Sequence, residues 1–562
     1  MPEVGGWTIA HLRCVWNAVE WRADVLAFPS HSRYSRGNAS VLPLSMNPSA
    51  RSFSILCRSL LPLRRRRILV LLAAGLASLV FDGALAGTSD STLNMCFRGR
   101  TIWVPPYMAG RFRRAGATDG PCGRIVQKWV RRYEGPAQST DQATALAVDR
   151  SGNVIVTGNS AGIERSVDYH TVKYAASNGK LMWQRRHNGR QNRHDQPRSV
   201  AVDRSGNAVV TGYSKIENNS DDYYTAKYAA ADGALLWERS YNGPGNGNDQ
   251  ACAVALDGSG NAIVTGLSEG VFPIGTTYYT AKYAAADGAL IWEKRSPGED
   301  DTAAALRVDG SGNVIVTGGS RQVGETHPHY YTVKYAAADG AVLWEKRHGG
   351  SDGRDEARAV AVDGTGNVIV TGFSYNAAGN SDYYTAKYRA ADGELLWERH
   401  HDGSSGTYDY SIASAVDTRG NVIVTGSEGD GDPDGFSRNF YTAKYAAEDG
   451  ALLWERRFSE SAQSYDYPAG LAVDRAGNVV VTGKSLNANS EAATVSHVYT
   501  AMYAAANGAL LWKKRYDGGQ PNGFDEPSAV AVDRVGNVMV TGSSQRVFAA
   551  DFLTIKYVRL PQ

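Results

Sequence analysis

From residue 125 to 557 the chain consists of short apolar or alternating runs, four to eight residues long, bounded by glycine or aspartate. This pattern is typical of β-strands, and no stretch after residue 124 keeps a helical period of useful length. Residues 359–399 show the arrangement in full, and we expect strands A to D at Ala359–Val362, Asn367–Thr371, Tyr383–Tyr388 and Glu394–Arg399. The sequence therefore predicts an all-β protein.

The sequence of the four-strand unit repeats eight times along the chain. Each copy carries Val-Asp-x-x-Gly-Asn, or one Leu-Asp variant, between strands A and B, and the aspartates lie 52 to 59 residues apart: Asp149, Asp203, Asp257, Asp309, Asp363, Asp417, Asp474 and Asp533. Repeats of this length are typical of a propeller or an array, in which each unit buries its faces against its neighbours.

The ends of the array predict how a ring would close. The last unit stops after a strand C at Phe552–Tyr557, whereas Ile125–Arg132, upstream of the first unit, resembles a strand D. We expect Ile125–Arg132 to complete the last blade, with Trp129 facing Tyr557, because closure removes exposed strand edges. The predicted fold is an eight-bladed β-propeller of four-stranded antiparallel blades over residues 124–562.

The turn between strands C and D predicts a register. Asp-Gly or Asn-Gly lies centrally in all seven complete units, which favours a type I′ hairpin. In the second unit this register places Lys227 opposite Glu238. In the seventh unit both partners change together, to Met502 and Lys513, which supports the pairing.

Two motifs carry a family resemblance. The sequence Val-Ala-Val-Asp-x-x-Gly-Asn-Val-Ile-Val-Thr-Gly resembles the bacterial β-propeller repeat family known as SBBP. The sequence Ala-Ala-Asp-Gly-Ala-Leu-Leu-Trp is similar to the tryptophan-docking repeat of quinoprotein dehydrogenases and of the eight-bladed outer-membrane assembly lipoproteins. The resemblance covers residues 125–557 and implies the propeller fold. It leaves the function open, because propellers support many activities.

Composition and charge narrow the class of protein. Among 562 residues there are 61 glycines, 30 tyrosines and 12 tryptophans, which excludes a disordered chain. The net charge is +2, but residues 1–135 hold 19 basic and 7 acidic side chains, so the rest of the chain carries a net charge of −10. The negative charge of residues 136–562 argues against nucleic acid as the main partner, because a nucleic-acid-binding surface is basic.

The N-terminal region predicts export. Four arginines, 64 to 67, precede an apolar run at Ile68–Phe81 and the small-x-small sequence Ala84-Leu85-Ala86, so residues 46–86 predict a signal peptide, with a faint likeness to a twin-arginine signal. A membrane anchor is the alternative, but the 14 apolar residues rise only about 21 Å as a helix, against a hydrocarbon core of about 30 Å. We expect Met46 to be the true start and residues 1–45 to be a gene-model extension or disordered.

An exported chain permits disulfides. Cys96 and Cys122 lie in a short Cys-bounded segment, residues 87–123, and we expect a bridge between them. The segment resembles a module at the start of some exported bacterial proteins, but Phe97 stands where that pattern has a histidine, which puts a metal role in doubt. Cys252 lies in an apolar run and is expected to be a buried free thiol.

Two residue types recur once per blade. The strand D tryptophans form either an aromatic ligand platform or, as we favour, inter-blade packing: Trp129, Trp183, Trp237, Trp292, Trp344, Trp397, Trp454 and Trp512. A ring of aspartates is expected at the channel mouth, eight residues before each A–B turn aspartate: Asp141, Asp195, Asp249, Asp301, Asp355, Asp409, Asp466 and Asp525. Their carboxylates either attract cations or accept hydrogen bonds from loop backbone, which we favour because eight unpaired carboxylates would repel one another.

One loop breaks the symmetry of the repeats. Asp430, Asp432 and Asp434 form the Asp-x-Asp-x-Asp-Gly opening of a calcium loop, but no closing glutamate follows, so a solvated acidic loop is the alternative. Two histidine pairs are weaker metal candidates, since no cysteine or carboxylate partner can be assigned to them: His327 with His329, and His400 with His401.

No nucleophile elbow, phosphate-binding loop or dinucleotide motif occurs in the sequence. We therefore predict a monomeric, non-enzymatic binding module, secreted, periplasmic or on the cell surface, without a cofactor unless the acidic loop holds calcium. Its partner would be a protein or polysaccharide of the cell envelope or exterior. The ligand face is expected at the variable B–C and D–A loops, centred on the longest, Ser427–Tyr441 and Lys484–Tyr499. The alternatives are a quinoprotein-like oxidoreductase and a polysaccharide-active enzyme.

Export is the first testable prediction. The native protein should begin at Gly87, because cleavage is expected after Ala86. N-terminal sequencing of protein recovered from the envelope or the medium measures this directly, and a non-reducing peptide map should contain Cys96 linked to Cys122. A cytosolic chain that begins at Met1 would contradict the prediction.

Overall fold

The structure, a computed structural model, describes most of residues 125–560, together with residues 10–16, 19–25 and parts of 93–119. The gaps within the repeat region are short: residues 138, 163–165, 190–192, 216–219, 272–274, 350–353, 404–406, 430–437, 461–463, 488–494, 521–522 and 546–548. The predicted signal peptide lies outside the described residues.

The chain divides into two compact units, Met1–Leu85 and Ala86–Gln562. Described residues of the first unit form an antiparallel pair of β1 (Ala10–Trp16) with β2 (Val19–Val25). The second unit begins with a small sheet in the order β4-β3-β5: β3 (Leu93–Phe97), β4 (Arg100–Val104) and β5 (Thr118–Asp119). In the part of the chain that the structure describes, no helix is long and apolar enough to span a bilayer.

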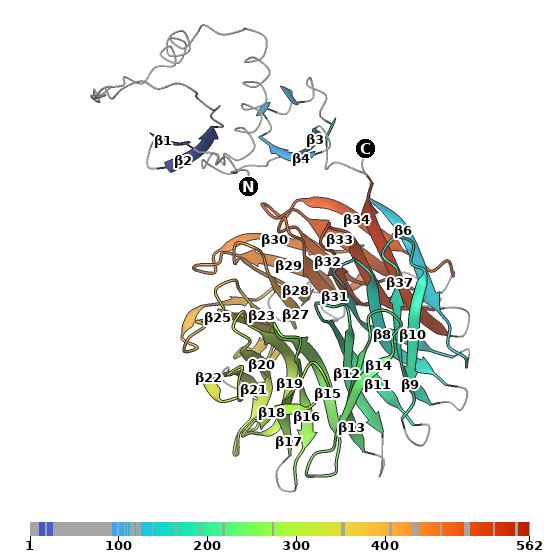
Figure 1. The fold of residues 1–562 in the computed structure, drawn as a ribbon. Helices are drawn as coiled ribbons and strands as arrows, with labels where there is room; N and C mark the ends of the chain where they lie inside the picture. Colours follow the sequence, from blue (N-terminus) through green and yellow to red (C-terminus); the bar gives the residue numbers. More distant parts are fainter. Residues whose placement is uncertain are drawn as a thin grey trace, which may run out of the picture. The chain divides into compact units, whose positions relative to one another are not determined.

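Residues 125–559 form eight four-stranded antiparallel blades that follow one another around a ring in chain order (Figure 1). In the order of strands A to D, blades 1 to 4 are β7 (Asp141–Val148), β8 (Val154–Ala161), β9 (Val167–Tyr174), β10 (Leu181–His187); β11 (Asp195–Val202), β12 (Ala208–Lys215), β13 (Asp221–Tyr228), β14 (Leu235–Tyr241); β15 (Asp249–Leu256), β16 (Ala262–Glu269), β17 (Thr276–Tyr283), β18 (Leu290–Arg295); and β19 (Glu299–Val308), β20 (Val314–Arg321), β21 (His329–Tyr335), β22 (Val342–His348). Blades 5 to 8 are β23 (Glu356–Val362), β24 (Val368–Tyr375), β25 (Ser381–Tyr388), β26 (Leu395–His401); β27 (Tyr410–Val416), β28 (Val422–Gly429), β29 (Arg438–Tyr445), β30 (Leu452–Phe458); β31 (Ser464–Val473), β32 (Val479–Asn487), β33 (Val495–Tyr503), β34 (Leu510–Tyr516); and β35 (Asp525–Val532), β36 (Val538–Gln545), β37 (Ala550–Arg559), β6 (Ile125–Tyr133).

The core lies in the two middle strands of each blade. All eight residues of β13 are buried, as are seven of the eight in β12. Strand D is the outer edge, and in β14 Leu235 and Leu236 are half exposed while Trp237 is buried. The near-continuous apolar runs of strands B and C thus reflect burial on both faces against neighbouring blades.

The A–B turn is closed by its own aspartate. In blade 1 the backbone N–H groups of Ser151 and Asn153 donate to Asp149 Oδ1 at 2.9 Å, and the Asn153 amide donates to Asp149 Oδ2 at 2.9 Å. Gly152 has φ +78°, a conformation that favours glycine. These contacts explain why Asp-x-x-Gly-Asn keeps its length in all eight copies.

The C–D turn differs from the predicted type I′ hairpin. In blade 2 only Gly233 of the Asp-Gly pair has positive φ, +72°, and four residues form the loop between Ala229 and Ala234. A bulge then inserts Leu236, so Lys227 lies opposite Trp237 and Ala226 opposite Glu238. The predicted pairing of Lys227 with Glu238 is wrong because the sequence count assumed a two-residue loop without a bulge.

Lys227 serves instead to join two blades. Its ammonium lies 3.0 Å from Asp203 Oδ2 of its own A–B turn and donates at 2.9 Å to the carbonyl of Ala285 in the next blade. The Trp237 indole N–H donates to the same carbonyl at 3.3 Å. A Cβ atom on Gly288 would lie 2.7 Å from the Trp237 ring, so the Asp-Gly turn of each blade is the surface on which its neighbour's tryptophan packs.

The propeller closes as predicted between the two ends of the repeat array. Strand β6 pairs with β37 (Figure 1). Blade 8 also contacts β7 of blade 1. The Trp129 indole N–H donates to Ala176 of blade 1 at 3.3 Å. One detail is wrong, because Trp129 lies opposite Lys556 and not opposite Tyr557, owing to the same bulge.

Blade 7 lacks the buried lysine for a physical reason. Its neighbour, blade 8, has no C–D turn, since β37 and β6 are the two ends of the array and no connection joins them. At this junction the Trp512 indole N–H donates to Met502 Sδ at 3.1 Å. Blade 8 has no C–D turn whose carbonyl could accept a hydrogen bond from a lysine ammonium. Lys513 lies opposite Ala501, so the joint change of Met502 and Lys513 does not report a cross-strand ion pair.

Closure by β6 generates the second testable prediction. A chain that starts at Glu134 lacks β6 and should aggregate or melt about 10 °C lower, because blade 8 loses its outer strand and exposes the edge of β37. Scanning calorimetry against a control chain that starts at Arg124 and retains β6 measures the effect. Equal melting of the two chains would contradict the eight-blade closure.

Candidate functional site: the face of the B–C and D–A loops

The ring aspartates lie where strands A begin, at the end of the propeller that carries the B–C and D–A loops. Asp195 is the first residue of β11, and Asp249 and Asp525 begin β15 and β35. All eight carry buried side chains, with exposed fractions of 0–2%: Asp141, Asp195, Asp249, Asp301, Asp355, Asp409, Asp466 and Asp525. Burial removes these carboxylates from the solvent of the channel.

Most ring carboxylates connect two loops of this end. Asp195 accepts hydrogen bonds from Gly189 N at 2.6 Å, in the D–A loop, and from the Ser214 hydroxyl at 2.5 Å, near the end of strand B. A Cβ atom on Gly189 would lie 2.4 Å from the Ser214 hydroxyl, which explains the glycine after strand D. Asp409 accepts in the same way from Gly403 N at 2.7 Å and Gly429 N at 2.8 Å.

The electrostatics of the ring follow from burial. Desolvation raises the pKa of Asp195 and of Asp409 to about 6, against opposing hydrogen bonds from loop backbone. Desolvation also raises the pKa of Asp141, Asp249, Asp301, Asp466 and Asp525. The geometry favours a role in holding the loops over an open ring that attracts cations.

The repeated tryptophans lie inside the blade junctions. Seven of them are 5–6% exposed: Trp129, Trp183, Trp237, Trp292, Trp344, Trp397 and Trp454. Trp512 is partly buried and contacts the core of blades 7 and 8. These positions are those of inter-blade packing and offer no aromatic platform to a ligand.

Blades 6 and 7 differ from the others at the ring. The sequence Tyr-Asp-Tyr occurs there twice, at 408–410 and 465–467, whereas blades 1 to 3 carry glutamine after the ring aspartate. Tyr408 is 48% exposed, and Tyr410, Tyr465 and Tyr467 are partly exposed. Because strand residues alternate in direction, the buried aspartate leaves its flanking tyrosines facing away from the blade core.

Basic side chains lie over these tyrosines. The Arg438 guanidinium is 5.2 Å from the ring of Tyr410 and donates to the Tyr408 carbonyl at 3.0 Å. A parallel bridge pairs Arg438 with Tyr465 and joins blades 6 and 7. The Lys484 ammonium lies 5.6 Å from the ring of Tyr467. The result is a half-exposed arc of aromatic and cationic groups, the Tyr-Asp-Tyr arc, over two adjacent blades.

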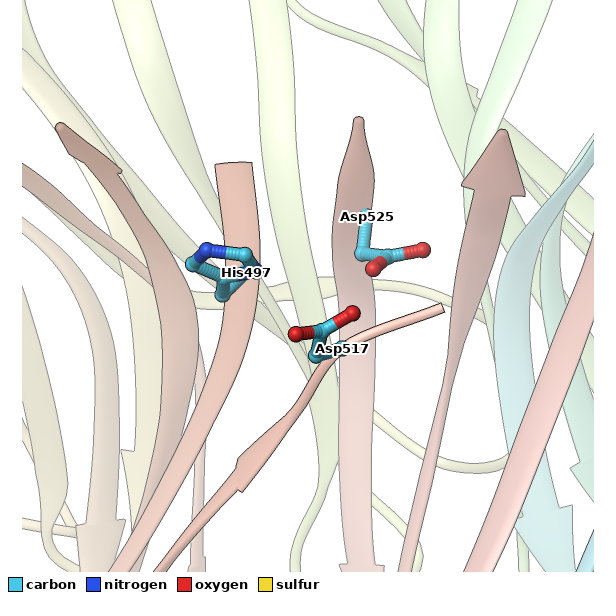
Figure 2. Close-up of side chains that lie close together, drawn as sticks. All are labelled: His497, Asp517 and Asp525. Carbon is cyan, nitrogen blue, oxygen red and sulfur yellow. The ribbon is translucent and has the colours of Figure 1, made fainter. Parts of the chain in front are cut away.

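Two blade junctions bring three metal-ligating side chains together at equivalent positions. Asp382, Asp402 and Asp409 meet between blades 5 and 6, and His497, Asp517 and Asp525 meet between blades 7 and 8 (Figure 2). In each set one residue comes from strand C, one follows strand D, and one is the ring aspartate of the next blade.

The histidines of the pairs predicted from sequence contact other groups in the fold. His329 Nδ1 lies 3.1 Å from Asp355 Oδ2, so this histidine pairs with a ring aspartate. His327 lines a cavity of about 370 Å³ with Arg321 and Arg354. His401 stacks on Tyr441 with ring centroids 3.9 Å apart.

Several sequence candidates cannot be placed. Asp430, Asp432 and Asp434 lie outside the described residues, and so does Cys122; of Cys96 only the backbone, in β3, is described. Cys252 is a free thiol that donates to the Ala303 carbonyl at 3.1 Å, and burial raises its pKa to about 12.

Sequence reasoning found the ring aspartates but missed the arc and the junction triads. The repeated Tyr-Asp-Tyr was visible in the sequence and was the available signal. No comparable signal marked the triads, because each draws on three segments whose proximity depends on the packing of two blades.

Two family models match the chain. The model described as "Beta-propeller repeat" matches residues 189–219, and the model described as "Outer membrane protein assembly factor BamB" matches residues 224–430. The resemblance drawn from the sequence is thereby confirmed, since the chain is similar to the SBBP and quinoprotein-like propellers. No curated protein matches the chain.

Similar solved structures of low sequence identity include the following three. One is BamB from Moraxella catarrhalis, with 14% identity and a TM-score of 0.37 over 77% of this chain and 97% of that one. Quinohemoprotein alcohol dehydrogenase ADHIIG from Pseudomonas putida HK5 has 11% identity and a TM-score of 0.46 over 78% of this chain and 77% of that one. The WD40 domain of SCAP from fission yeast has 10% identity and a TM-score of 0.42 over 77% of this chain and 98% of that one.

The ring generates the third testable prediction. Burial raises the pKa of Asp195 from 3.8 to about 6, so the folded protein favours the protonated carboxyl. The resulting contribution to the free energy of unfolding is fully present below pH 3.8 and is lost as the pH rises through 6. Asp195→Asn lacks this titration. The free energy of unfolding of the variant should therefore fall below that of the parent by more at pH 4 than at pH 7, and the two deficits should differ by at most about 3 kcal/mol. Urea unfolding at both pH values measures the difference, and a pH-independent difference would contradict the prediction.

Proposed function

We propose that the protein is an exported, non-enzymatic binding module that holds a protein partner of the cell envelope on the face of the B–C and D–A loops. The observation that carries the proposal is the Tyr-Asp-Tyr arc. Blades 6 and 7 keep the four-stranded fold of the other blades but differ on this face, where tyrosines and cations gather. A rigid repeat scaffold with one distinct surface is the usual arrangement of a recognition site.

The arc lies beside the two segments with the longest B–C connections. Tyr410 is opposite Ser427, and Tyr467 is opposite Lys484, the first residues of those segments. Tyrosine and arginine are the side chains enriched at protein interfaces, which favours a protein partner over a polysaccharide. The match to a family described as an outer membrane protein assembly factor supports a setting in the envelope.

The test compares two matched variants of the mature chain. Tyr408→Ser with Tyr467→Ser removes the exposed part of the arc, and Leu395→Ser with Leu396→Ser removes two half-exposed apolar side chains at the opposite end of blade 5. Each protein is immobilised and exposed to solubilised envelope proteins and, separately, to envelope polysaccharide. We expect a defined protein to be retained by the parent and the leucine variant, with at least about tenfold weaker binding to the tyrosine variant.

Three outcomes would contradict the proposal. They are equal binding of a partner to both variants, retention of polysaccharide alone, and a change in visible absorption on adding pyrroloquinoline quinone with calcium. The last would favour the quinoprotein-like oxidoreductase. Unchanged melting of the tyrosine variant shows that lost binding does not reflect unfolding.

A further inference from the structure

The triad between blades 7 and 8 combines a histidine with two carboxylates. His497 lies on β33, Asp517 follows β34, and Asp525 begins β35 (Figure 2). One ligand atom from each lies within 4.8 Å of the others. His497 is 6% exposed and Asp525 is 2% exposed, whereas Asp517 is exposed and can adjust its position.

A buried ring nitrogen at this place has no hydrogen-bond partner among the described residues. His497 Nδ1 is enclosed and unpartnered, whereas buried polar groups in proteins are nearly always satisfied. The Asp525 carboxylate is held by backbone, since Gly518 N donates to it at 2.6 Å, whereas Asp517 makes a local hydrogen bond within its loop, from Gly519 N at 2.8 Å. A ligand that accepts one nitrogen and two oxygens would account for the arrangement.

We propose that His497, Asp517 and Asp525 form a binding site for a divalent transition metal of the zinc type. Three protein ligands with nitrogen and oxygen donors, and a fourth position for water, suit this ion, whereas calcium requires six to eight oxygens. Ligands of a tetrahedral zinc site lie about 3.4 Å apart, and the three ligand atoms lie within 4.8 Å of one another, so any contraction needed is at most about 1.4 Å. The loop position of Asp517 permits this movement.

Arg515 lies against the triad. One of its guanidinium nitrogens lies 2.6 Å from His497 Nε2. A metal on Nε2 would take the lone pair that the guanidinium uses, and a metal on Nδ1 would move the ring proton to Nε2. In either case Arg515 must turn away, and Glu460 Oε1 already lies 3.4 Å from it as an alternative partner. Arg515 therefore competes with the metal.

The equivalent positions of other junctions supply controls. Between blades 5 and 6 they hold Asp382, Asp402 and Asp409, without a histidine. Between blades 1 and 2, Asp168 takes the place of His497 and is paired with Arg186 at 2.6 Å. Between blades 4 and 5, His329 takes the place of His497 and lies 3.1 Å from ring Asp355, but Gly349 stands at the position of Asp517. Only the junction of blades 7 and 8, among those described here, therefore combines one histidine with two carboxylates.

The test is a titration of the EDTA-treated mature chain with Co²⁺, followed by visible absorption, and with Zn²⁺ in competition. We expect one site per chain and at least tenfold weaker binding to His497→Phe and to Asp517→Asn. Because Asp517 is exposed, its variant should fold normally. Arg515→Gln should bind about tenfold more tightly, while His327→Ala and Asp382→Asn should bind like the parent.

The proposal is overturned if the parent binds no Co²⁺ or Zn²⁺ stoichiometrically, or if binding survives unchanged in Asp517→Asn and His497→Phe. Loss of the site in Asp382→Asn would place the metal at blades 5 and 6 and would equally overturn it. Unchanged or weaker binding by Arg515→Gln would overturn the competition with Arg515. None of these results depends on the partner proposed for the Tyr-Asp-Tyr arc.

Discussion

The propeller depends on a buried ammonium that is shared between neighbouring blades. Lys282 has an exposed side-chain fraction of 6%, pairs with Asp257 at 2.9 Å and donates to the Ala337 carbonyl of the next blade at 2.8 Å. An isolated buried charge costs several kcal/mol, and removing one partner of a buried pair typically costs 3–5 kcal/mol. The ammonium is therefore satisfied only when the A–B turn is formed and the next blade is docked, which couples local structure to assembly of the ring.

The same residues explain where sequence reasoning succeeded and failed. Strand order, blade number and closure were predictable because apolar runs, glycine positions and the stray Ile125–Arg132 strand are local features of the sequence. The partner of Lys227 was not predictable, because one inserted residue, Leu236, shifts the register and a residue 58 positions away, Ala285, supplies the second contact. Side-chain pairing across a hairpin depends on loop length, which the Asp-Gly sequence alone does not determine.

The candidate site was also predictable only in part. The aspartate ring was visible as a repeat, and its hydrogen bonds to loop backbone fit the interpretation favoured from charge repulsion. The arc and the triads depend on residues that differ from the repeat, such as Tyr410 and His497. What these residues contact depends on the neighbouring blade, which the local sequence does not show. In a repeat protein the shared positions reveal the scaffold, whereas the exceptions reveal the surface on which blades can acquire separate roles.

Closure by β6 also determines the order in which the molecule can be completed. The first strand of the propeller to leave the ribosome or a translocation pore is β6, yet its partner β37 is made more than 400 residues later. The entropy of joining such distant segments grows only with the logarithm of their separation, so the equilibrium is little affected. The rate is affected, because β6 must remain unpaired while seven blades form. Blade 8, which β6 completes last, packs against Met502 of blade 7, and this is the junction at which the lysine that links other neighbouring blades is missing.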